Sequence, residues 1–338
     1  MGKKENAAKK GFQSAGLQKL LALGALVILY IFFCFFGSNF ASGSTFVSIL
    51  DSSYYVGFLA LGVTFVIITG GIDLSIGTNM MCSALIGGYL YSAGHLPIGV
   101  CLAIVVAIAT LFGLVNGLLI AKLKLPPFIA TLGVMMTTQG IGGIVTKVQT
   151  QHFPSAFEAN GWYKSIFYKT PSTSAMPSGF PTGIIYIGLF FLLALFLLNK
   201  TRFGRYTYAM GSNEEAVRLS GVNVMKWKTL VYTVCGFFAG LAGIVYVATY
   251  TTVIPGTGNG LELKAIAAVI IGGTSLAGGV GTMSGTVIGV FLMSVLSNGL
   301  MSMGFQGQYQ TFFTGLVVIL AVLLDIYRSK KASEIKIH

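Results

Sequence analysis

Ten apolar segments, separated by polar connections, run through almost the whole chain. They lie at about 20–36, 50–69, 79–93, 97–121, 127–146, 182–198, 229–249, 263–276, 283–303 and 309–327. Most approach the ~20 residues that a helix needs to cross a hydrocarbon core of ~30 Å at 1.5 Å per residue. Two are shorter: 79–93, and the run from 263 to the glycines at 272–273. The pattern predicts an all-α integral membrane protein with about ten transmembrane helices.

The basic residues indicate how these segments are oriented. If the N-terminus is inside and the segments alternate, all but four of the 21 lysines and arginines fall on the inner side. The four outer ones are Lys147, Lys164, Lys169 and Lys264. Because cytoplasmic loops carry the excess of basic residues, both termini are expected in the cytoplasm. Residues 1–19 and 328–338 then flank a membrane domain at 20–327, with a periplasmic loop at 147–181 and a basic cytoplasmic loop at 199–228.

Composition supports a membrane protein and excludes several other classes. Of the 338 residues, 54% are hydrophobic and only 9% are charged, against roughly a quarter charged in soluble domains. The net charge of +12 does not indicate nucleic-acid binding, because the basic residues cluster at the ends of apolar segments. The N-terminus resembles a signal peptide, but no cleavage site follows, so an uncleaved first helix is expected. Four cysteines without CxxC spacing and three scattered histidines predict no metal site.

A glycine-rich stretch that interrupts the apolar pattern occurs twice. VIITGGIDLSIGT (66–78) aligns with AVIIGGTSLAGGVGT (268–282), and both copies follow segments that run from outside to inside. The alignment places Gly70 and Gly71 on Gly272 and Gly273, and Asp73 on Ser275. Paired glycines tolerate positive φ and close backbone approach, so both stretches are expected to break a membrane helix. Broken helices at matching positions indicate a parallel pseudo-repeat and a transport pathway.

Asp73 is the one charged residue of these two stretches. With Ser75 it can cap the helix that follows, through side-chain oxygens placed at the positive end of the helix dipole. Two other interpretations stay open: Asp73 lines the pathway, or it binds a proton or sodium ion, since ionisable residues inside membranes are often functional. The candidate broken-helix and pathway residues are Gly70, Gly71, Asp73, Ser75, Gly272, Gly273 and Ser275.

The inner loop contains a second informative stretch, SNEEAVRLSG at 212–221. Ser212 followed by Glu215 matches a capping box, and Gly221 is a natural helix stop, so a complete short helix is predicted. A helix this short is marginal in water and must be held by packing, either on its own protein or in a groove of a cytoplasmic partner. Ala216, Val217, Leu219 and Val222 are its candidate anchors. An ordinary positive-inside loop is the simpler alternative.

No enzymatic motif accompanies these features. The chain has no GxxxxGK[ST] phosphate loop, no HExxH pattern and no recognisable Ser-His-Asp arrangement. An enzyme acting alone is therefore not expected. If transport is active, its energy comes from an ion gradient or from another subunit.

Four stretches carry a resemblance to a known family. They are ITGGIDLSIG, KLPPFIATLG (124–133), TRFGRYTYAMGSNEEAVRLSGVNV (201–224) and LKAIAAVIIGGTSLAGGVGT (263–282). In this order they resemble the permeases of bacterial ABC importers for monosaccharides, over about 45–327. One detail departs from the family pattern: relatives often have an acidic residue shortly after the position of Glu262, where this chain has Lys264.

The resemblance implies a multi-pass subunit of the bacterial cytoplasmic membrane, in contact with lipid, that moves a pentose or hexose inward. Its implied partners are a second permease subunit, identical or related, a cytoplasmic ATPase that binds ATP and Mg²⁺, and a periplasmic or lipid-anchored sugar-binding protein. No cofactor is implied in this chain. The coupling helix that docks on the ATPase is carried over to Asn213, Glu214, Glu215, Ala216, Val217, Arg218, Leu219, Ser220 and Gly221. A passage lined by polar and aromatic residues is expected, rather than a tight sugar site.

Two other functions remain as alternatives. One is an ion-coupled secondary transporter that uses Asp73 as its coupling site. The other is a membrane scaffold or receptor subunit, which the two glycine breaks disfavour because a scaffold has no need of broken helices.

Overall fold

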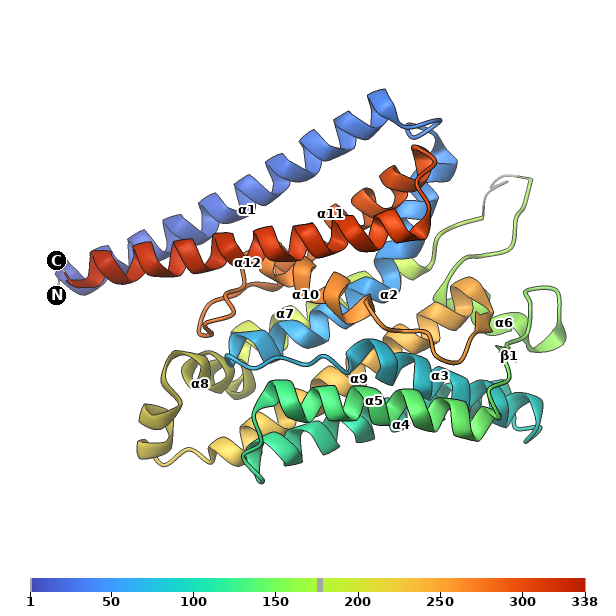
Figure 1. Ribbon diagram of the computed structural model, residues 1–338, viewed down its shortest axis with the longest axis horizontal. Coiled ribbons are helices and arrows are strands. Elements are labelled where there is room, and N and C mark those ends of the chain that lie inside the picture. The colour runs from blue at the N-terminus through green and yellow to red at the C-terminus, as the bar shows by residue number, and fades with distance from the viewer. Residues whose placement is uncertain (1, 175–178, 338) are drawn as a thin grey trace.

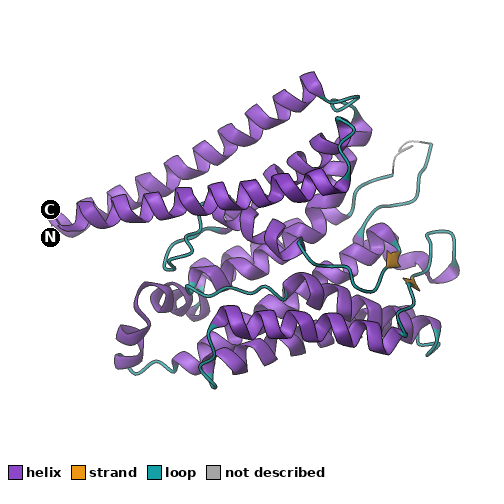
Figure 2. Ribbon diagram, viewed as in Figure 1, coloured by secondary structure: helices purple, strands orange, loops and turns teal. Residues whose placement is uncertain are grey.

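The computed structural model describes residues 2–174 and 179–337, which are almost entirely helical (Figures 1 and 2). Residues 175–178 of the predicted outer loop, and the first and last residues of the predicted terminal segments, lie outside the described residues. The helices that carry the ten apolar segments are α1 (Gly2–Phe36), α2 (Gly43–Ile68), α3 (Ile76–Ser92), α4 (Ile98–Ala121), α5 (Pro127–Thr146), α7 (Gly183–Lys200), α9 (Val224–Tyr250), α10 (Leu261–Ile271), α11 (Met283–Ser302) and α12 (Gly307–Ile337).

Eight of the described helices are long and apolar enough to cross a membrane. The two apolar segments expected to be short are short in the structure: α3 has 17 residues and α10 has 11. Each is joined to its break, since α3 follows the first glycine stretch and α10 precedes the second. The prediction of an all-α integral membrane protein is confirmed.

Helix α2 lies at the centre of the bundle, and 89% of the residues in its most apolar stretch are buried. Helix α9 packs against α2 on one side and against α4 on the other. Helices α4 and α9 approach closely because glycines face each other: a Cβ on Gly113 would lie 2.8 Å from the Gly236 Cα. Small residues let membrane helices approach in this way. By contrast, only 11% of the residues in the apolar stretch of α1, and 11% in that of α12, are buried. These two helices therefore expose apolar side chains on the outside of the bundle, as a lipid-facing helix does.

The two ends of the bundle differ. Helix α1 begins and α12 ends near the end that carries α8 (Arg202–Leu219), whereas α6 (Trp162–Phe167) and β1 (Gln151–His152) lie at the opposite end (Figure 1). The predicted outer loop is partly ordered: it holds β1, a 3₁₀ turn η1 (Ala159–Gly161) and α6. Strand β1 pairs antiparallel with β2 (Thr252–Val253), which fixes the loop to the end of α9.

Candidate functional site

The first glycine stretch breaks the chain between α2 and α3, as predicted. Gly70 has a φ of +74°, a conformation that side chains with a Cβ rarely adopt. The Gly71 N–H returns to the Val66 carbonyl at 3.2 Å, and a Cβ on Gly71 would lie 2.5 Å from the Tyr232 hydroxyl. The two positions therefore require glycine for different reasons: Gly70 has a positive φ in the turn, and at Gly71 a side chain would collide with Tyr232 of α9.

Asp73 is buried in this break and bound by neutral donors. Its Oδ1 accepts from the Ser75 N–H at 2.9 Å and from the Ser75 hydroxyl at 2.7 Å. The Asn116 amide contributes a longer contact of 3.4 Å to each carboxylate oxygen. Within the part of the chain that the structure describes, no lysine or arginine forms an ion pair with Asp73.

Asp73 and Ser75 do not cap α3 through their side-chain oxygens in the way the sequence predicted. Ser75 occupies the N-cap position of α3, but its side chain makes no capping bond to the helix: the hydroxyl donates to Asp73 and accepts from the Asn116 amide at 2.8 Å. Asp73 lies before the cap and closes a local turn onto the Ser75 N–H. The carboxylate thus organises the break itself rather than the end of α3.

The second stretch breaks the chain between α10 and α11. Gly273 carries the positive φ, +93°, and a Cβ on Gly272 would collide with the Gly285 carbonyl. Of the two glycine pairs, the members with positive φ are Gly70 in the first and Gly273 in the second. By backbone conformation Gly70 therefore corresponds to Gly273, one residue later than the Gly272 on which the sequence alignment placed it.

A carboxylate also organises this second break, but it comes from another helix. Asp325 on α12 accepts from the Ser275 hydroxyl at 3.1 Å and from the Leu276 N–H at 2.9 Å. Ser275, aligned with Asp73, is thus a donor to an acid rather than a replacement for one. Each break has one carboxylate that binds a nearby backbone N–H and a serine hydroxyl.

The two breaks meet beneath α8. The Gly279 N–H of the second break donates to the Ile68 carbonyl at the end of α2, at 2.8 Å. A Cβ on Gly211 of α8 would collide with that same carbonyl oxygen and lie 2.5 Å from the Gly279 nitrogen. The Tyr208 hydroxyl, one turn earlier on α8, donates to the Gly281 carbonyl at 2.7 Å. Helix α8 therefore contacts both breaks through backbone.

Helix α8 is two helices joined at Asn213, whose φ of −164° and ψ of 96° are extended. The Asn213 Oδ1 accepts from the Ala216 N–H at 2.9 Å. The N-cap is therefore Asn213 and not Ser212, and the predicted capping box with Glu215 is wrong by one residue. Ser212 instead belongs to the first half of α8, in contact with the second break at Gly279. Gly221, with a φ of +83°, ends the helix as predicted.

The predicted coupling helix, residues 213–221, is held to the bundle by one face only. Val217 is 8% exposed, whereas Leu219 is 77% exposed. Lys228 of α9 pairs with Glu214 at 2.6 Å. On the exposed face Arg218 donates to Glu215 at 3.0 Å, and this hydrogen bond lowers the pKa of the Glu215 carboxyl. Of the predicted anchors, Val217 packs inward, Val222 is half-buried, and Ala216 and Leu219 are exposed.

A groove lies beside the coupling helix at the same end. It encloses about 650 Å³ between the α4–α5 connection, the coupling helix and the start of α9. Its lining residues are Ile120, Ala121, Lys124, Leu125, Pro126, Pro127, Glu214, Glu215, Arg218, Val224, Met225 and Lys228. The sequence motif KLPPFIATLG therefore begins in this groove. Together the groove and Leu219 form a surface with both charged and apolar groups.

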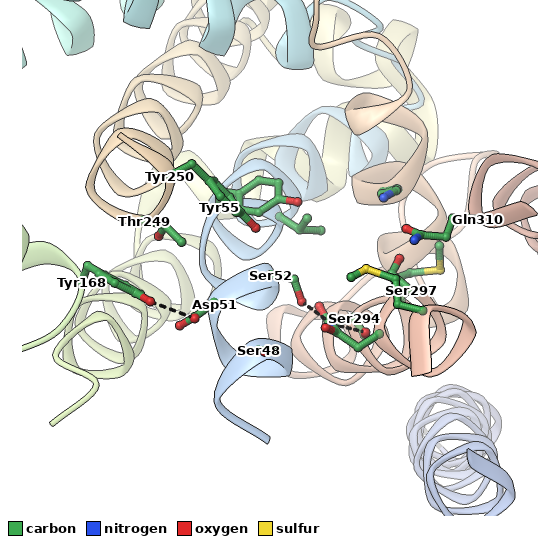
Figure 3. A pocket seen from close by; sticks show the side chains of 15 residues that line it. Ser48, Asp51, Ser52, Tyr55, Tyr168, Thr249, Tyr250, Ser294, Ser297 and Gln310 are labelled. Carbon is green, nitrogen blue, oxygen red and sulfur yellow. Dashed lines mark hydrogen bonds between the residues drawn. The ribbon is translucent and has the colours of Figure 1, made fainter. Parts of the chain in front are cut away.

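The opposite end of the bundle has a polar pocket that no sequence motif indicated. This outer pocket holds about 350 Å³ and is lined by Ser48, Asp51, Ser52, Tyr55, Val56, Tyr168, Thr249, Tyr250, Lys264, Met293, Ser294, Ser297, Asn298, Met301 and Gln310 (Figure 3). Lys264, the residue that departs from the family pattern, is among them. The residues come from α2, α9, α10, α11, α12 and the outer loop, so no single stretch carries a recognisable pattern.

Comparisons with known proteins agree with this arrangement. Residues 45–322 match the family described as branched-chain amino acid transport system / permease component. The chain is 38% identical to the ribose import permease protein RbsC of Escherichia coli, over 94% of this chain and 97% of the relative. It is 33% identical to the fructose import permease protein FrcC of Rhizobium meliloti, over 88% of this chain and 82% of the relative. It is 30% identical to the xylose transport system permease protein XylH of Escherichia coli, over 93% of each. No solved structure shows significant similarity. The chain belongs to this family of multi-pass membrane permeases, the transport components of ABC importers.

Proposed function

We propose that the chain is the permease subunit of a binding-protein-dependent ABC importer that moves a monosaccharide into a bacterial cell. The names of three relatives support a sugar: ribose, fructose and xylose permeases are 30–38% identical over most of the chain. The family description also includes branched-chain amino acids. The lining of the outer pocket favours the sugar, since hydroxyl and amide side chains outnumber the apolar ones.

We assign both termini and α8 to the cytoplasm, with ten helices entering or crossing the bilayer. The excess of basic residues around α8 supports this orientation, as does the position of α8 near the start of α1 and the end of α12 (Figure 1). The two breaks support a parallel pseudo-repeat, because each has a positive-φ glycine after a helix and a carboxylate that binds the freed N–H groups.

The observation that carries the proposed mechanism is the contact of α8 with both breaks. A cytoplasmic ATPase, which would itself bind ATP and Mg²⁺, docks on the exposed face of residues 213–221. A displacement of that face moves Gly211, and Gly211 has no free space against the Ile68 carbonyl or the Gly279 nitrogen. Because packed interiors deform little, the displacement reaches both breaks together. Opening and closing of the pathway then follow the ATPase cycle.

The remaining partners follow from the same proposal. A second permease subunit, identical or related, completes the pathway, and a sugar-binding protein delivers substrate to the outer loop at 147–181. The chain itself needs no cofactor. The groove beside the coupling helix supplies a second contact for the ATPase, with Lys124 and Lys228 near Glu214 and Arg218.

The test is extraction of the protein from its native membranes in mild detergent, with identification of co-purifying chains and an assay of ATP hydrolysis. We expect an ATPase that remains bound and hydrolyses ATP in the complex. A chain that purifies without an ATPase and transports sugar down an ion gradient would refute the proposal. It would favour ion-coupled transport through Asp73, whose burial among neutral donors is the feature consistent with that alternative.

A further inference from the structure

We propose that the outer pocket is a low-affinity acceptor site for a neutral monosaccharide, in which Asp51 and Ser294 bind sugar hydroxyls and Tyr250 contacts the ring face. The inference rests on the proposed function and adds to it a position where substrate first contacts the permease. It also assigns sugar specificity to particular residues, which no sequence motif identified.

The pocket has the size and position that such a site needs. Its volume of about 350 Å³ lies at the lower end of the roughly 300–1,000 Å³ range of small-molecule sites. It lies between the outer halves of α2, α9 and α11 and the Tyr168 end of α6, which is the end of the bundle opposite to the coupling helix (Figures 1 and 3).

Two buried polar atoms in the pocket wall have no hydrogen-bond partner among the described residues. They are the Asp51 Oδ1 and the Ser294 Oγ. An unpartnered buried polar group destabilises a fold, so its presence next to a cavity points to a ligand or water that completes its hydrogen bonds. Both residues line the cavity. A carboxylate that accepts from a hydroxyl is a strong and selective contact for a polyol.

The other polar groups hold this wall in position. The Tyr168 hydroxyl donates to the Asp51 Oδ2 at 2.9 Å, which leaves the second carboxylate oxygen as the available acceptor. The Asn298 amide donates to the Ser52 Oγ and to the Ser294 carbonyl, both at 2.9 Å. Three elements are thereby tied together around the cavity: the outer loop, α2 and α11. Preorganised groups of this kind reduce the cost of binding.

Aromatic rings form another side of the pocket. Figure 3 shows Tyr55 and Tyr250 together, with Asp51 and Ser294 across from them. The Tyr55 ring lies 5.4 Å from that of Tyr246, and Tyr246 lies 4.9 Å from Tyr250, so the three rings support one another. Tyr55 is 8% exposed and Tyr250 is 44% exposed. The Tyr250 ring therefore offers an accessible apolar surface for the C–H face of a sugar.

The charges select a neutral ligand. The lining contains one carboxylate, Asp51, and one ammonium group, Lys264, with serine, threonine, asparagine and glutamine making up most of the remainder. Within the lining, an anionic ligand would meet Asp51 with only Lys264 to offset the repulsion. A branched-chain amino acid is the competing ligand, because its two charges match Asp51 and Lys264. Its side chain, however, would find only Val56, Met293 and Met301 as aliphatic surface.

The test is uptake by the complete complex of permease, ATPase and binding protein in proteoliposomes, with radiolabelled ribose, fructose, xylose and leucine as probes. We expect import of at least one sugar by the unchanged complex. Asp51→Asn should lower that import about 10- to 100-fold, the effect of losing one charged hydrogen bond. Ser294→Ala and Tyr250→Ala should lower it less. The matched control for the loss of a hydroxyl is Thr137→Ala, an exposed position of α5 outside the pocket lining, which should leave uptake unchanged.

Two further measurements separate a binding defect from misfolding. Thermal unfolding of Ser294→Ala should occur at the same or a higher temperature, because the change removes an unpartnered buried hydroxyl. Asp51→Asn should unfold within a few degrees of the unchanged protein, because the amide oxygen still accepts from the Tyr168 hydroxyl. Saturation-transfer NMR of the transported sugar with the permease in nanodiscs should give a signal that Asp51→Asn abolishes. Unchanged sugar uptake and an unchanged signal in Asp51→Asn would overturn this inference and leave the proposed function standing. Import of leucine without any sugar by the unchanged complex would overturn both.

Discussion

Replacing Leu219 by Asp changes the most exposed apolar side chain of the coupling helix. Leu219 is 77% exposed, and Val217 on the opposite face already holds the helix to the bundle. The substitution should therefore alter the fold by no more than about 0.5 kcal/mol, the usual effect of a surface change. Glu214, on the same helix, is a less suitable position for a substitution, because an arginine there would face Lys228, whose side chain is only 16% exposed.

The expected loss of ATPase affinity follows from two contributions. Burying a leucine side chain in a partner groove contributes about 1.5–3 kcal/mol. An aspartate in the same groove adds about 1–3 kcal/mol for an unpaired polar group. The sum of about 2.5–6 kcal/mol corresponds to a weakening of roughly 70- to 25,000-fold. Leu219→Ala removes only the apolar contact and should weaken binding roughly 10- to 100-fold.

The assay is binding of the purified ATPase to the permease in nanodiscs, followed by biolayer interferometry. Phe157→Asp is the matched control, since Phe157 is fully exposed on the outer loop and receives the same chemical change at the other end of the bundle. Thermal unfolding of all variants excludes a folding defect. If Leu219→Asp binds the ATPase as tightly as the unchanged permease, the exposed face of residues 213–221 is not the docking surface.

Three further predictions concern the breaks. Asp73→Asn should keep transport and change the free energy of unfolding by about 1 kcal/mol or less, because the amide oxygen still accepts from the Ser75 N–H and a flip of the Asn116 amide turns its unpartnered Oδ1 toward the new NH₂. Loss of sugar uptake with normal folding would instead show that the charge itself is needed. Asp325→Ala should lower the free energy of unfolding in detergent by about 1–3 kcal/mol, since the Leu276 N–H loses its partner. An unchanged unfolding temperature would contradict this role. Gly211→Ala should reduce sugar-stimulated ATP hydrolysis and destabilise the fold by about 1–3 kcal/mol through overpacking, whereas Gly24→Ala in α1, with nothing near its Cβ, should be neutral or stabilising.

Local sequence features predicted most of the helical architecture. Each apolar segment corresponds to a helix, because length and hydropathy alone determine where a chain can enter lipid. The paired glycines correctly marked both breaks. They did not reveal which glycine of each pair adopts positive φ, since either can do so and the packing of neighbouring helices decides. In the first pair it is Gly70, and in the second it is Gly273.

At the start of the coupling helix the prediction from sequence is wrong by a single residue. Ser212 and Asn213 are equally good N-caps by propensity, and the choice depends on the packing of Ser212 against the second break. That contact joins residues far apart in the chain, and no local pattern encodes it. The same holds for Asp325, which binds a break about 50 residues away, and for the outer pocket, whose lining comes from several helices and the outer loop.

The hydrogen bond from the Gly279 N–H to the Ile68 carbonyl has a consequence for biogenesis. Ile68 is synthesised roughly 200 residues before its partner, which at 5–20 residues per second is an interval of about 10–40 s. During this time the end of α2 lacks a partner that lipid cannot supply. The nascent chain must keep that carbonyl hydrated or shielded by the insertion machinery. A ribosome that stalls before Gly279 therefore leaves an N-terminal fragment that is inserted but incomplete, and such a fragment should be a substrate for membrane quality-control proteases.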